Sequence, residues 1–279
     1  MAVLFNDGIR AGSSAGGSDI MKKIPKSCVI DREKASYLTH VSSATAATSL
    51  KKWTFSCWLK GELEGGQLLS VGSYTSGGAT RVFNHIFTPE GYPMIQTYNA
   101  AAYFSDNHER QCDPTNWRHY QLVLDTDQAA DVDRFVIYVN GRRLPDYTGN
   151  PSLGDLFGVG YPTTTHNIGA NSAGASGVAN GEYLNCIISD VHFVDGEALE
   201  TTKFAKEDDN GKLQPIVYDG PWGNKGYHLD FNEYNTTGAN VQFEDQSGNG
   251  NHWEGINVET TGRLMDIVND SPSDYEDDA

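Results

Sequence analysis

The sequence predicts an all-β protein whose two antiparallel sheets pack as a sandwich or jelly roll. Short runs of bulky and β-branched residues recur along the chain, and each run is bounded by Gly, Pro, Asn or Asp. Segments with helical periodicity are scarce, and the 30 glycines and 14 tyrosines also argue against a helical protein. At 279 residues and 38% hydrophobic content, the chain can form one large β domain or two small ones.

The first half of the chain holds an arm and then a series of short strands. Residues 1–27 become Gly- and Ser-rich after a short apolar patch, which predicts an arm or linker rather than a part of the core. From Ala35 onward, apolar runs alternate with turn-forming residues. The strands predicted from these runs are ASYLTHV (35–41), KKWTFSCWLKG (51–61), GQLLSVGSY (66–74), TRVFNHIFT (80–88), PMIQTY (93–98) and AAYFS (101–105).

The clearest local signal is a pair of apolar runs on either side of an acidic loop. WRHYQLVLD (117–125) precedes the loop and DRFVIYVNGRRL (133–144) follows it, so we expect strands at 117–125 and 134–140 to be neighbours. The second run contains Asn140-Gly141, the favoured dipeptide of a type I′ hairpin turn.

The segment 181–211 predicts one more long strand and the only helical signal. GEYLNCIISDVHFVDGEAL (181–199) has the apolar content of a strand followed by a turn. ETTKFAKEDDNG (200–211) can form about two helical turns at most, and Gly211 would end them.

Charge is distributed unevenly along the chain. The formal net charge is −17, and residues 230–279 contain twelve acids against Arg263 alone, which argues against nucleic acid as a partner. No run approaches the roughly 20 apolar residues of a membrane span, and the first residues lack the layout of a signal peptide. We therefore expect a soluble chain without membrane insertion.

The four cysteines show no close-spaced framework. Cys28, Cys57, Cys112 and Cys186 are far apart in the sequence, and Cys57 and Cys186 lie within apolar strand patterns. A free thiol in such a position behaves as a small buried hydrophobe. All four are expected to be reduced, as in a chain that folds in a cytosol.

Six of these runs occur in an order that resembles the concanavalin-A-like, laminin-G-like jelly roll. They are YLTHV, WTFSCWLK, LLSVGS, WRHYQLVLD, FVIYVNGRRL and the closing HNIGANSAG with GEYLNCIISDVHFVDGEAL, and they cover residues 28–205. With the opening VLFNDGIRAGSSAGG and the late LDFNE and DQSGNGNHW, the layout is similar to virion structural proteins of tailed phages, particularly marine ones.

This resemblance implies a noncatalytic virion structural protein that decorates a phage capsid or forms a tail appendage. Its partners would be other virion proteins and copies of itself, with a host surface glycan as a further ligand of the lectin-like domain. The virion would be its location, assembled in the host cytoplasm. A free carbohydrate-binding lectin is an alternative, although it would not need the two unusual chain ends.

The stretch DQSGNGNHW (245–253) lies at an unusual place for this family. Its Ser, Gly and Asn residues predict a turn, and HWEGINVET (252–260) predicts the strand that follows. In the laminin-G-like family such a turn and its acidic strand come ahead of YLTHV, whereas here they come last. Residues 254–279 are too few for a second jelly roll, so we expect a displaced edge strand that closes this sandwich or a neighbour's.

The expected layout is an N-terminal arm (1–27), a jelly roll (28–262) that includes the late strands (227–260), and an acidic tail (263–279). Neither end can bury enough apolar surface to offset its ordering entropy in an isolated monomer. We therefore expect partners to hold both ends, with the tail on a basic surface. The expected assembly anchor of the arm is the apolar set Val3, Leu4, Phe5 and Ile9.

A hydrolase of the same fold is the competing class, and the sequence argues against it. Retaining glycosidases need two carboxyl groups about 5 Å apart. The nearest match to the paired acids of this fold's glucanases is Glu62, Glu64 and Gln67, where Gln replaces an acid and glycines indicate a turn. We therefore expect no catalytic residues.

Two further residue sets are candidates for ligand binding. Asp125, Asp127, Asp131 and Asp133 crowd one loop and could hold calcium, but the loop lacks the glycine of an EF-hand, so a solvated loop is predicted, with no metal site. Five aromatic residues lie in or beside Asn- and Gly-rich segments, as in sugar-binding surfaces, although each could instead fill the rim of the sandwich. These glycan-binding candidates are Tyr74, Tyr98, Tyr103, Trp222 and Trp253.

Overall fold

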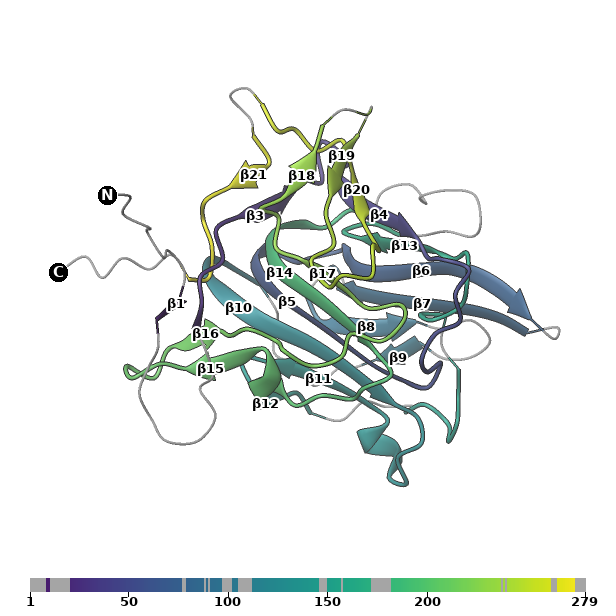
Figure 1. Cartoon of the computed structure of the whole chain (residues 1–279). Coiled ribbons are helices and arrows are strands. Elements are labelled where there is room, and N and C mark those ends of the chain that lie inside the picture. The colour runs from purple at the N-terminus through teal and green to yellow at the C-terminus, as the bar shows by residue number, and fades with distance from the viewer. Residues whose placement is uncertain are drawn as a thin grey trace.

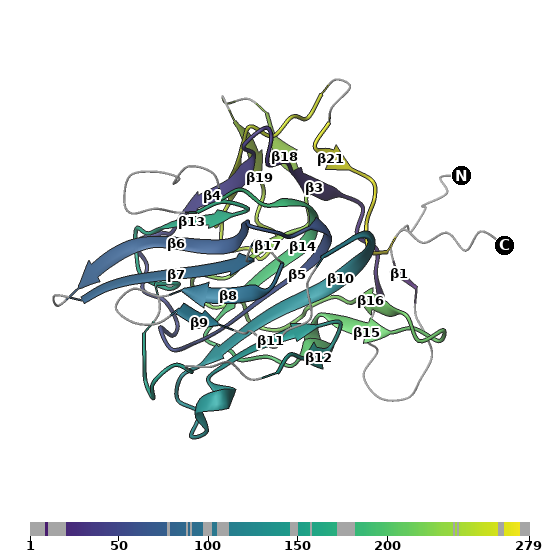
Figure 2. The same cartoon turned by 180° about the vertical axis from the view of Figure 1, so that it is seen from behind.

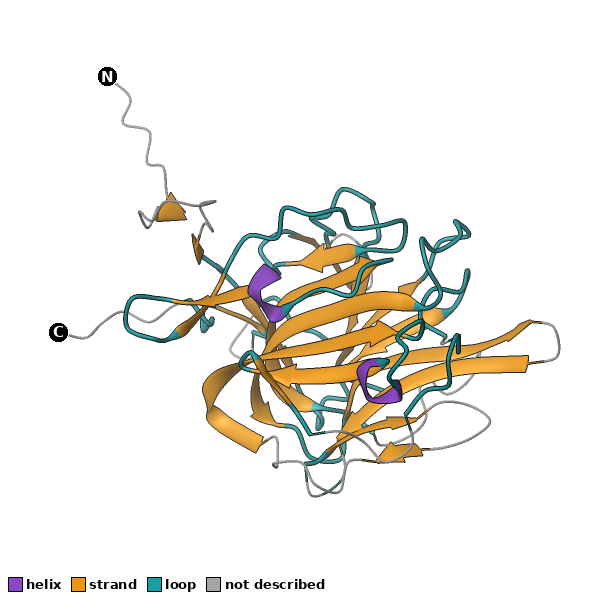
Figure 3. Ribbon diagram, turned by 90° about the horizontal axis from the view of Figure 1, so that it is seen from below, coloured by secondary structure: helices purple, strands orange, loops and turns teal. Residues whose placement is uncertain are grey.

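Two large antiparallel sheets, here called sheet I and sheet II, face one another in the computed structural model (Figures 1 and 2). The structure describes residues 9–10, 21–76, 79–87, 89, 91–96, 102–104, 112–145, 150–156, 158–171, 182–236, 238, 240–261 and 265–273. Strands dominate this described part, and its helical elements are the short 3-10 turns η1 (Asp131–Asp133) and η3 (Thr201–Lys203) (Figure 3). The all-β sandwich predicted from the sequence is confirmed.

Sheet I contains eight strands and sheet II nine. The strands of sheet I, in spatial order, are β12 (Arg142–Arg143), β11 (Phe135–Val139), β10 (Cys112–Asp125), β5 (Lys52–Glu62), β14 (Asn185–Asp195), β3 (Ser27–Ile30) and β21 (Ile267–Val268), with β17 (Tyr227–Leu229) also paired to β14. The strands of sheet II are β18 (Tyr234–Asn235), β19 (Val241–Phe243), β20 (Trp253–Ile256), β4 (Tyr37–Val41), β13 (Thr165–Ile168), β6 (Gln67–Ser76), β7 (Ala79–Phe87), β8 (Pro93–Gln96) and β9 (Ala102–Phe104).

Two small ribbons accompany the sandwich. β1 (Ile9–Arg10) pairs with β2 (Met21–Lys22), and β15 (Ala205–Glu207) pairs with β16 (Leu213–Pro215). Met21 also forms an isolated bridge with Ile216, which joins the two ribbons. In the described residues, no helix has the length and apolar character to span a membrane.

Alternating side chains of β5 are buried on both faces of sheet I. Trp53, Phe55 and Cys57 point into the main core between the sheets. Thr54 and Ser56 point to the outer face but are also buried. The Thr54 hydroxyl donates to the Glu197 carbonyl over 2.8 Å. Sheet I is therefore covered on its outer face too, with β15 and β16 beside β10 and β11 (Figure 1).

The predicted hairpin after β10 is confirmed. β10 pairs with β11, and Val139 pairs with Arg142 across the turn. Asn140 and Gly141 have φ angles of 50° and 75°, and the type I′ turn requires positive φ at both positions. The helix expected at 200–211 is reduced to η3, because the residues after it pair as β15 with β16 and Ala205 is buried.

The late strand lies in this chain's own sandwich. β20 pairs with β4 on one side and with β19 on the other, so it lies inside sheet II rather than at its edge. The turn before it is organised by Asp245, whose carboxylate accepts from the backbone N–H groups of His228 (2.9 Å), Ser247 (2.9 Å) and Asn251 (2.9 Å). Asn249 and Asn251 both donate to the Gly226 carbonyl, which fixes the turn against the segment before β17.

The described parts of both chain ends pack on the sandwich. Ile24, in the segment predicted as the N-terminal arm, is fully buried among Trp58, Trp117 and Ala205. In the expected tail, Asp266 pairs with Lys34 of this chain over 2.8 Å. The apolar contact of Ile24 and the short strand β21 explain why these segments are ordered. Val3, Leu4 and Phe5 lie outside the described residues, as does the side chain of Ile9.

Three of the four cysteines are described with their side chains. Cys28, Cys57 and Cys186 are free and buried, as expected. Burial raises the pKa of each of these thiols, which keeps them protonated and unreactive. The side chain of Cys112 lies outside the described residues.

The stability of the fold is expected to fall as the solution becomes acidic. Burial lowers the pKa of His85, His119 and His166 to about 3, so these imidazoles stay neutral in the folded state. In the unfolded chain they take up protons below about pH 6.5, so their contribution is present above that pH and is lost progressively toward pH 3. Between about pH 7 and pH 5.5 each histidine should cost roughly 1 kcal/mol of unfolding free energy. Urea denaturation at both pH values measures this, and equal stability would contradict it.

Candidate functional site

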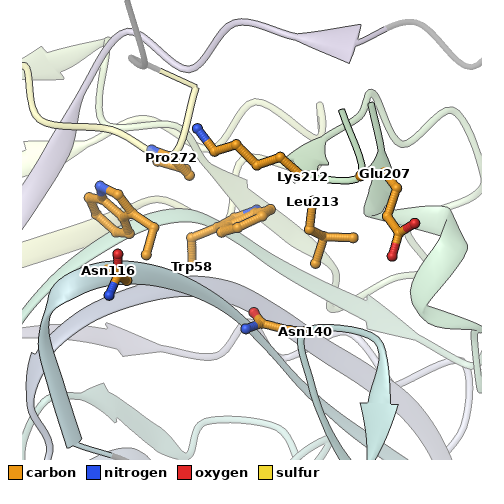
Figure 4. Close-up of a pocket in the computed structure, with 9 residues that line it drawn as sticks. Trp58, Asn116, Asn140, Glu207, Lys212, Leu213 and Pro272 are labelled. Atoms are coloured by element: carbon orange, nitrogen blue, oxygen red, sulfur yellow. The ribbon is translucent and has the colours of Figure 1, made fainter. Parts of the chain in front are cut away.

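A pocket opens on the outer face of sheet I, between the sheet and the β15–β16 ribbon (Figure 4). Its volume is about 330 Å³, at the small end of the range for ligand pockets. The lining residues come from β5, β10, the hairpin turn after β11, the β15–β16 ribbon and the C-terminal segment. They are Trp58, Asn116, Trp117, Asn140, Glu207, Gly211, Lys212, Leu213 and Pro272.

The two indoles of the pocket are held in fixed orientations. The Trp117 Nε1–H donates to the Asp270 carboxylate over 2.9 Å. Trp58 lies against the His119 ring, with 5.3 Å between the ring centroids and 50° between their planes. His119 is in turn fixed by Ser56, since the Ser56 Oγ and His119 Nε2 are 2.7 Å apart. An aromatic surface that is already ordered loses little entropy when a ligand packs on it.

The Ser56–His119 pair supports Trp58 and is not placed to attack a substrate. Ser56 is 2% exposed and His119 is fully buried, so neither atom reaches the pocket solvent. Burial, with a smaller effect from His192, lowers the pKa of His119 to about 3 and leaves the imidazole a weak base. A nucleophile must reach the substrate, and the buried Ser56 hydroxyl does not.

Polar side chains surround the indoles. The Asn140 Oδ1 accepts the backbone N–H of His119 over 2.9 Å, which orients the Asn140 amide. The Asn116 amide donates to the Asp113 carboxylate over 2.9 Å. In Figure 4, Lys212 extends along the pocket and Glu207 lies at its far side. Aromatic surface beside oriented amides can pack on the apolar face of a small polar ring and hydrogen-bond its hydroxyl groups.

The C-terminal segment closes one side of the pocket. Pro272 lines it, and Asp270 connects this segment to sheet I through Trp117 and through Lys60, whose Nζ is 2.7 Å from the Asp270 carboxylate. The Lys60 ammonium also lies 6.0 Å from the centre of the Trp117 ring, within cation–π range. Residues of the predicted acidic tail (263–279) thus build part of the site.

The two sequence candidates whose side chains the structure describes, Trp222 and Trp253, do not line this pocket. Trp253 is fully buried in the core between the sheets, so its ring is not open to a sugar. Trp222 is partly buried in an aromatic cluster, where it stacks on His228. Tyr98 lies outside the described residues, and Tyr74 and Tyr103 belong to β6 and β9 but their side chains are not described.

The other sequence candidates are also separated from the pocket. Glu62 ends β5 on the protein surface, Glu64 follows in a turn, and Gln67 is fully buried beside Glu182.

The acidic loop does not gather its carboxylates around one point. Three of its acids form ion pairs: Asp125 with Lys52 (3.0 Å), Asp127 with Lys51 (3.0 Å) and Asp133 with Arg143 (2.6 Å). The fourth, Asp131, accepts the backbone N–H of Val132. In the described part of the chain, these acids form no metal-binding group, so the structure gives no support to a calcium site there.

Trp58 and Trp117 were not predicted as pocket residues, because the local sequence pattern indicates only that each lies in a strand. A signal was present for Trp58, since alternation along WTFSCW puts it on the same face as Thr54 and Ser56. The opposite wall, formed by Leu213 and Pro272, could not be predicted from local sequence patterns, because only the tertiary fold brings these residues to the pocket.

Comparison with known proteins adds information on the fold. No family model matches the sequence, and a search of curated proteins finds no match. A heptameric SAP-like pentraxin from Limulus polyphemus is 18% identical, with a TM-score of 0.40 over 64% of this chain and 80% of the pentraxin chain. A Bacteroides ovatus protein described as carbohydrate-binding is 16% identical, with a TM-score of 0.47 over 88% of this chain and 63% of that chain.

The CBM40 module of a Ruminococcus gnavus sialidase is 16% identical, with a TM-score of 0.40 over 64% of this chain and 96% of the module. At these identities and TM-scores, the likenesses concern the fold alone.

Proposed function

We propose that this chain is a noncatalytic carbohydrate-binding protein and that the pocket between Trp58 and Trp117 is its binding site. The observation that carries the proposal is a pocket of about 330 Å³ in which the exposed parts of two fixed indoles, 3% of Trp58 and 9% of Trp117, lie beside oriented amides. Its small volume suits a mono- or disaccharide unit at the end of a glycan. The ligand is expected to contact the exposed part of the Trp117 ring and to hydrogen-bond Asn116 or Asn140.

Binding without hydrolysis is favoured by the carboxylates of the pocket. Glycosidases use two acids, about 5 Å apart in retaining enzymes and about 6.5–9.5 Å apart in inverting ones. Among the described residues that line the pocket, Glu207 is the single acid, and it is exposed. A second candidate, Asp270, already accepts from Trp117 and Lys60.

Replacement of Trp117 by alanine should lower glycan affinity by about tenfold or more, since an aromatic anchor in a small pocket supplies much of the binding energy. Trp117→Phe keeps an aromatic surface and should retain most of the affinity. The measurement is binding to an array of neutral and acidic mono- and disaccharides, followed by calorimetry on the best of them. Tyr234→Ala, at an exposed aromatic residue on β18, is the matched control.

Two results would count against this function. Unchanged binding by a folded Trp117→Ala variant would place the ligand elsewhere. Release of reducing sugar by the wild-type protein, lost in Glu207→Gln, would indicate a hydrolase.

The finer proposal is that this binding serves attachment from a phage virion, as capsid decoration or a tail appendage. Its support is the sequence resemblance together with the apolar patch Val3, Leu4, Phe5 and Ile9, which suits an anchor on a neighbouring virion protein or another copy. Deleting residues 2–20 should leave a folded domain that no longer joins particles. Labelled-antibody electron microscopy of intact particles tests the location. Absence of the protein from purified virions would refute the virion role and would leave the proposal of a glycan-binding pocket standing.

A further inference from the structure

A β-bulge in β14 brings an aspartate and a histidine to the outer face of sheet I. Ser189 pairs with Trp58 and His192 pairs with Ser56, so Asp190 and Val191 together oppose one residue of β5. Asp190 has a φ of 48°, a left-handed conformation that few residues other than Gly, Asn and Asp adopt readily. Val191 keeps its place in the core.

β17 adds a second histidine directly beside the first. His228 is the cross-strand partner of His192, and the two rings meet edge to face with their centroids 4.5 Å apart. The His228 ring also stacks on Trp222, with planes 9° apart, and the His192 ring contacts Phe204. Both imidazoles are therefore held in place by aromatic neighbours.

The nitrogen atoms of these rings converge on one carboxylate. His192 Nε2 and His228 Nε2 each lie 2.9 Å from Asp190 Oδ1, and the ligand atoms of the three residues lie within 4.8 Å of one another. In a tetrahedral zinc site with bonds of about 2.0–2.1 Å, neighbouring ligand atoms lie about 3.3 Å apart. An ion would need the two 2.9 Å contacts to open by about 0.4 Å and the two imidazole nitrogens, at most 4.8 Å apart, to reach the same spacing.

Lys22 shows that this position attracts a cation. Its ammonium group contacts Asp190 Oδ1 and lies 2.8 Å from His228 Nε2. The His228 Nε2 carries either a proton or a lone pair, so it cannot donate to Asp190 and accept from Lys22 at the same time. One of the two close contacts is left without a hydrogen bond in either tautomer.

A metal ion would remove this conflict. Both imidazole lone pairs and the Asp190 carboxylate could then point at the same positive charge, with the ring protons on Nδ1. Two imidazoles and one carboxylate are ligands that zinc and its neighbours in the first transition row prefer. We propose that Asp190, His192 and His228 form a binding site for a divalent ion of the zinc type, and that the Lys22 ammonium competes with the ion for it.

The position of Lys22 indicates how an ion reaches the site and connects the site to the N-terminal segment. The side chains of Lys22 and His228 are 16% and 12% exposed, whereas those of Asp190 and His192 are almost fully covered, so an ion enters along Lys22. Binding of the ion displaces Lys22 from Asp190. Because Lys22 belongs to β2, the ion and the docked N-terminal segment should weaken each other's binding.

The His192 Nδ1 has no hydrogen-bond partner among the described residues, so a proton placed there on ligation would be unsatisfied. His192 should therefore be a weaker ligand than His228.

Zinc binding to the full-length protein, measured by calorimetry after chelator treatment and dialysis, tests the site. We expect one ion per chain, bound roughly 5- to 150-fold more tightly by Lys22→Met than by the wild type, the usual range for such coupling. Asp190→Asn and His228→Phe, each made in the Lys22→Met background, should abolish this binding, and His192→Phe should weaken it less. Phenylalanine keeps the ring contacts, and circular dichroism verifies that each variant folds.

Asp127→Asn in the same background is the matched control, because it removes an exposed carboxylate from the acidic loop and should leave zinc binding unchanged. Cobalt absorption in the Lys22→Met variant provides an independent readout of a nitrogen-rich site. The proposal is overturned if a folded Lys22→Met variant binds no zinc at one ion per chain, or if its binding survives His228→Phe.

Discussion

Replacing Trp253 with alanine is expected to lower the free energy of unfolding by about 3–5 kcal/mol, the usual cost of removing a large aromatic side chain from a core. Trp253 is fully buried in β20. Its ring stacks on His40 with 5.5 Å between centroids and lies 4.9 Å from the Tyr227 ring. The loss would leave a cavity where β4, β17 and β20 meet, so both sheets would lose contacts.

Urea denaturation at neutral pH measures this loss. Tyr234→Ala is the control, because Tyr234 lies on the same sheet but is 37% exposed, and it should change stability far less. A loss below about 1 kcal/mol for Trp253→Ala would mean that the late strand is an appendage of the sandwich rather than a part of its core.

Asp245→Ala is expected to be similarly costly, at roughly 3–5 kcal/mol, although it removes little apolar surface. The Asp245 carboxylate accepts backbone N–H groups from three separate positions, at His228, Ser247 and Asn251. A buried donor such as the Asn251 N–H costs about 1–3 kcal/mol when it loses its acceptor, the two partly buried donors add to this, and the turn between β19 and β20 would lose the group that organises it.

Two variants separate this explanation from a general effect of charge. Asp127→Ala removes an exposed carboxylate and should stay within about 0.5 kcal/mol of the wild type. Asp245→Asn keeps one acceptor oxygen and should have an intermediate cost. If Asp245→Asn and Asp245→Ala were both as stable as the wild type, the hydrogen bonds would not be what holds the turn.

Local patterns predicted the strands well where a turn-forming dipeptide adjoins the apolar runs. Asn140-Gly141 is enough to predict the β11–β12 turn from the local sequence, and β10 and β11 follow from the apolar runs beside it. The helical expectation at 200–211 failed because strand pairing between β15 and β16 overrode a weak local preference. The fate of the chain ends was also beyond local reasoning, since Ile24 is buried only by residues far away in the sequence.

The candidate sites were harder to predict than the fold. Both depend on residues that meet across long sequence distances, such as Trp58 with Pro272 in the pocket, or Asp190 with His228 and Lys22. Asp190 and His192 are two residues apart in SDVHFVD, a spacing that suggests a shared strand face. Their actual positions depend on the β-bulge between Ser189 and His192, and no local sequence pattern indicated that bulge. Aromatic residues in polar segments were a poor guide, because Trp253 shows that such a residue can be core.

The antiparallel pairing of the two end segments determines how the protein would respond to mechanical load. Ser27 and Cys28 pair with Val268 and Ile267, and the Ile24 backbone N–H donates to Ser273 over 2.8 Å, so both segments leave the sandwich at the same end. A pull on the two ends would therefore unzip these contacts one after another instead of shearing them all together, and would need little force. Because Asp270 and Pro272 lie within the unzipped stretch, tension would take away one wall of the pocket before it disturbed either sheet.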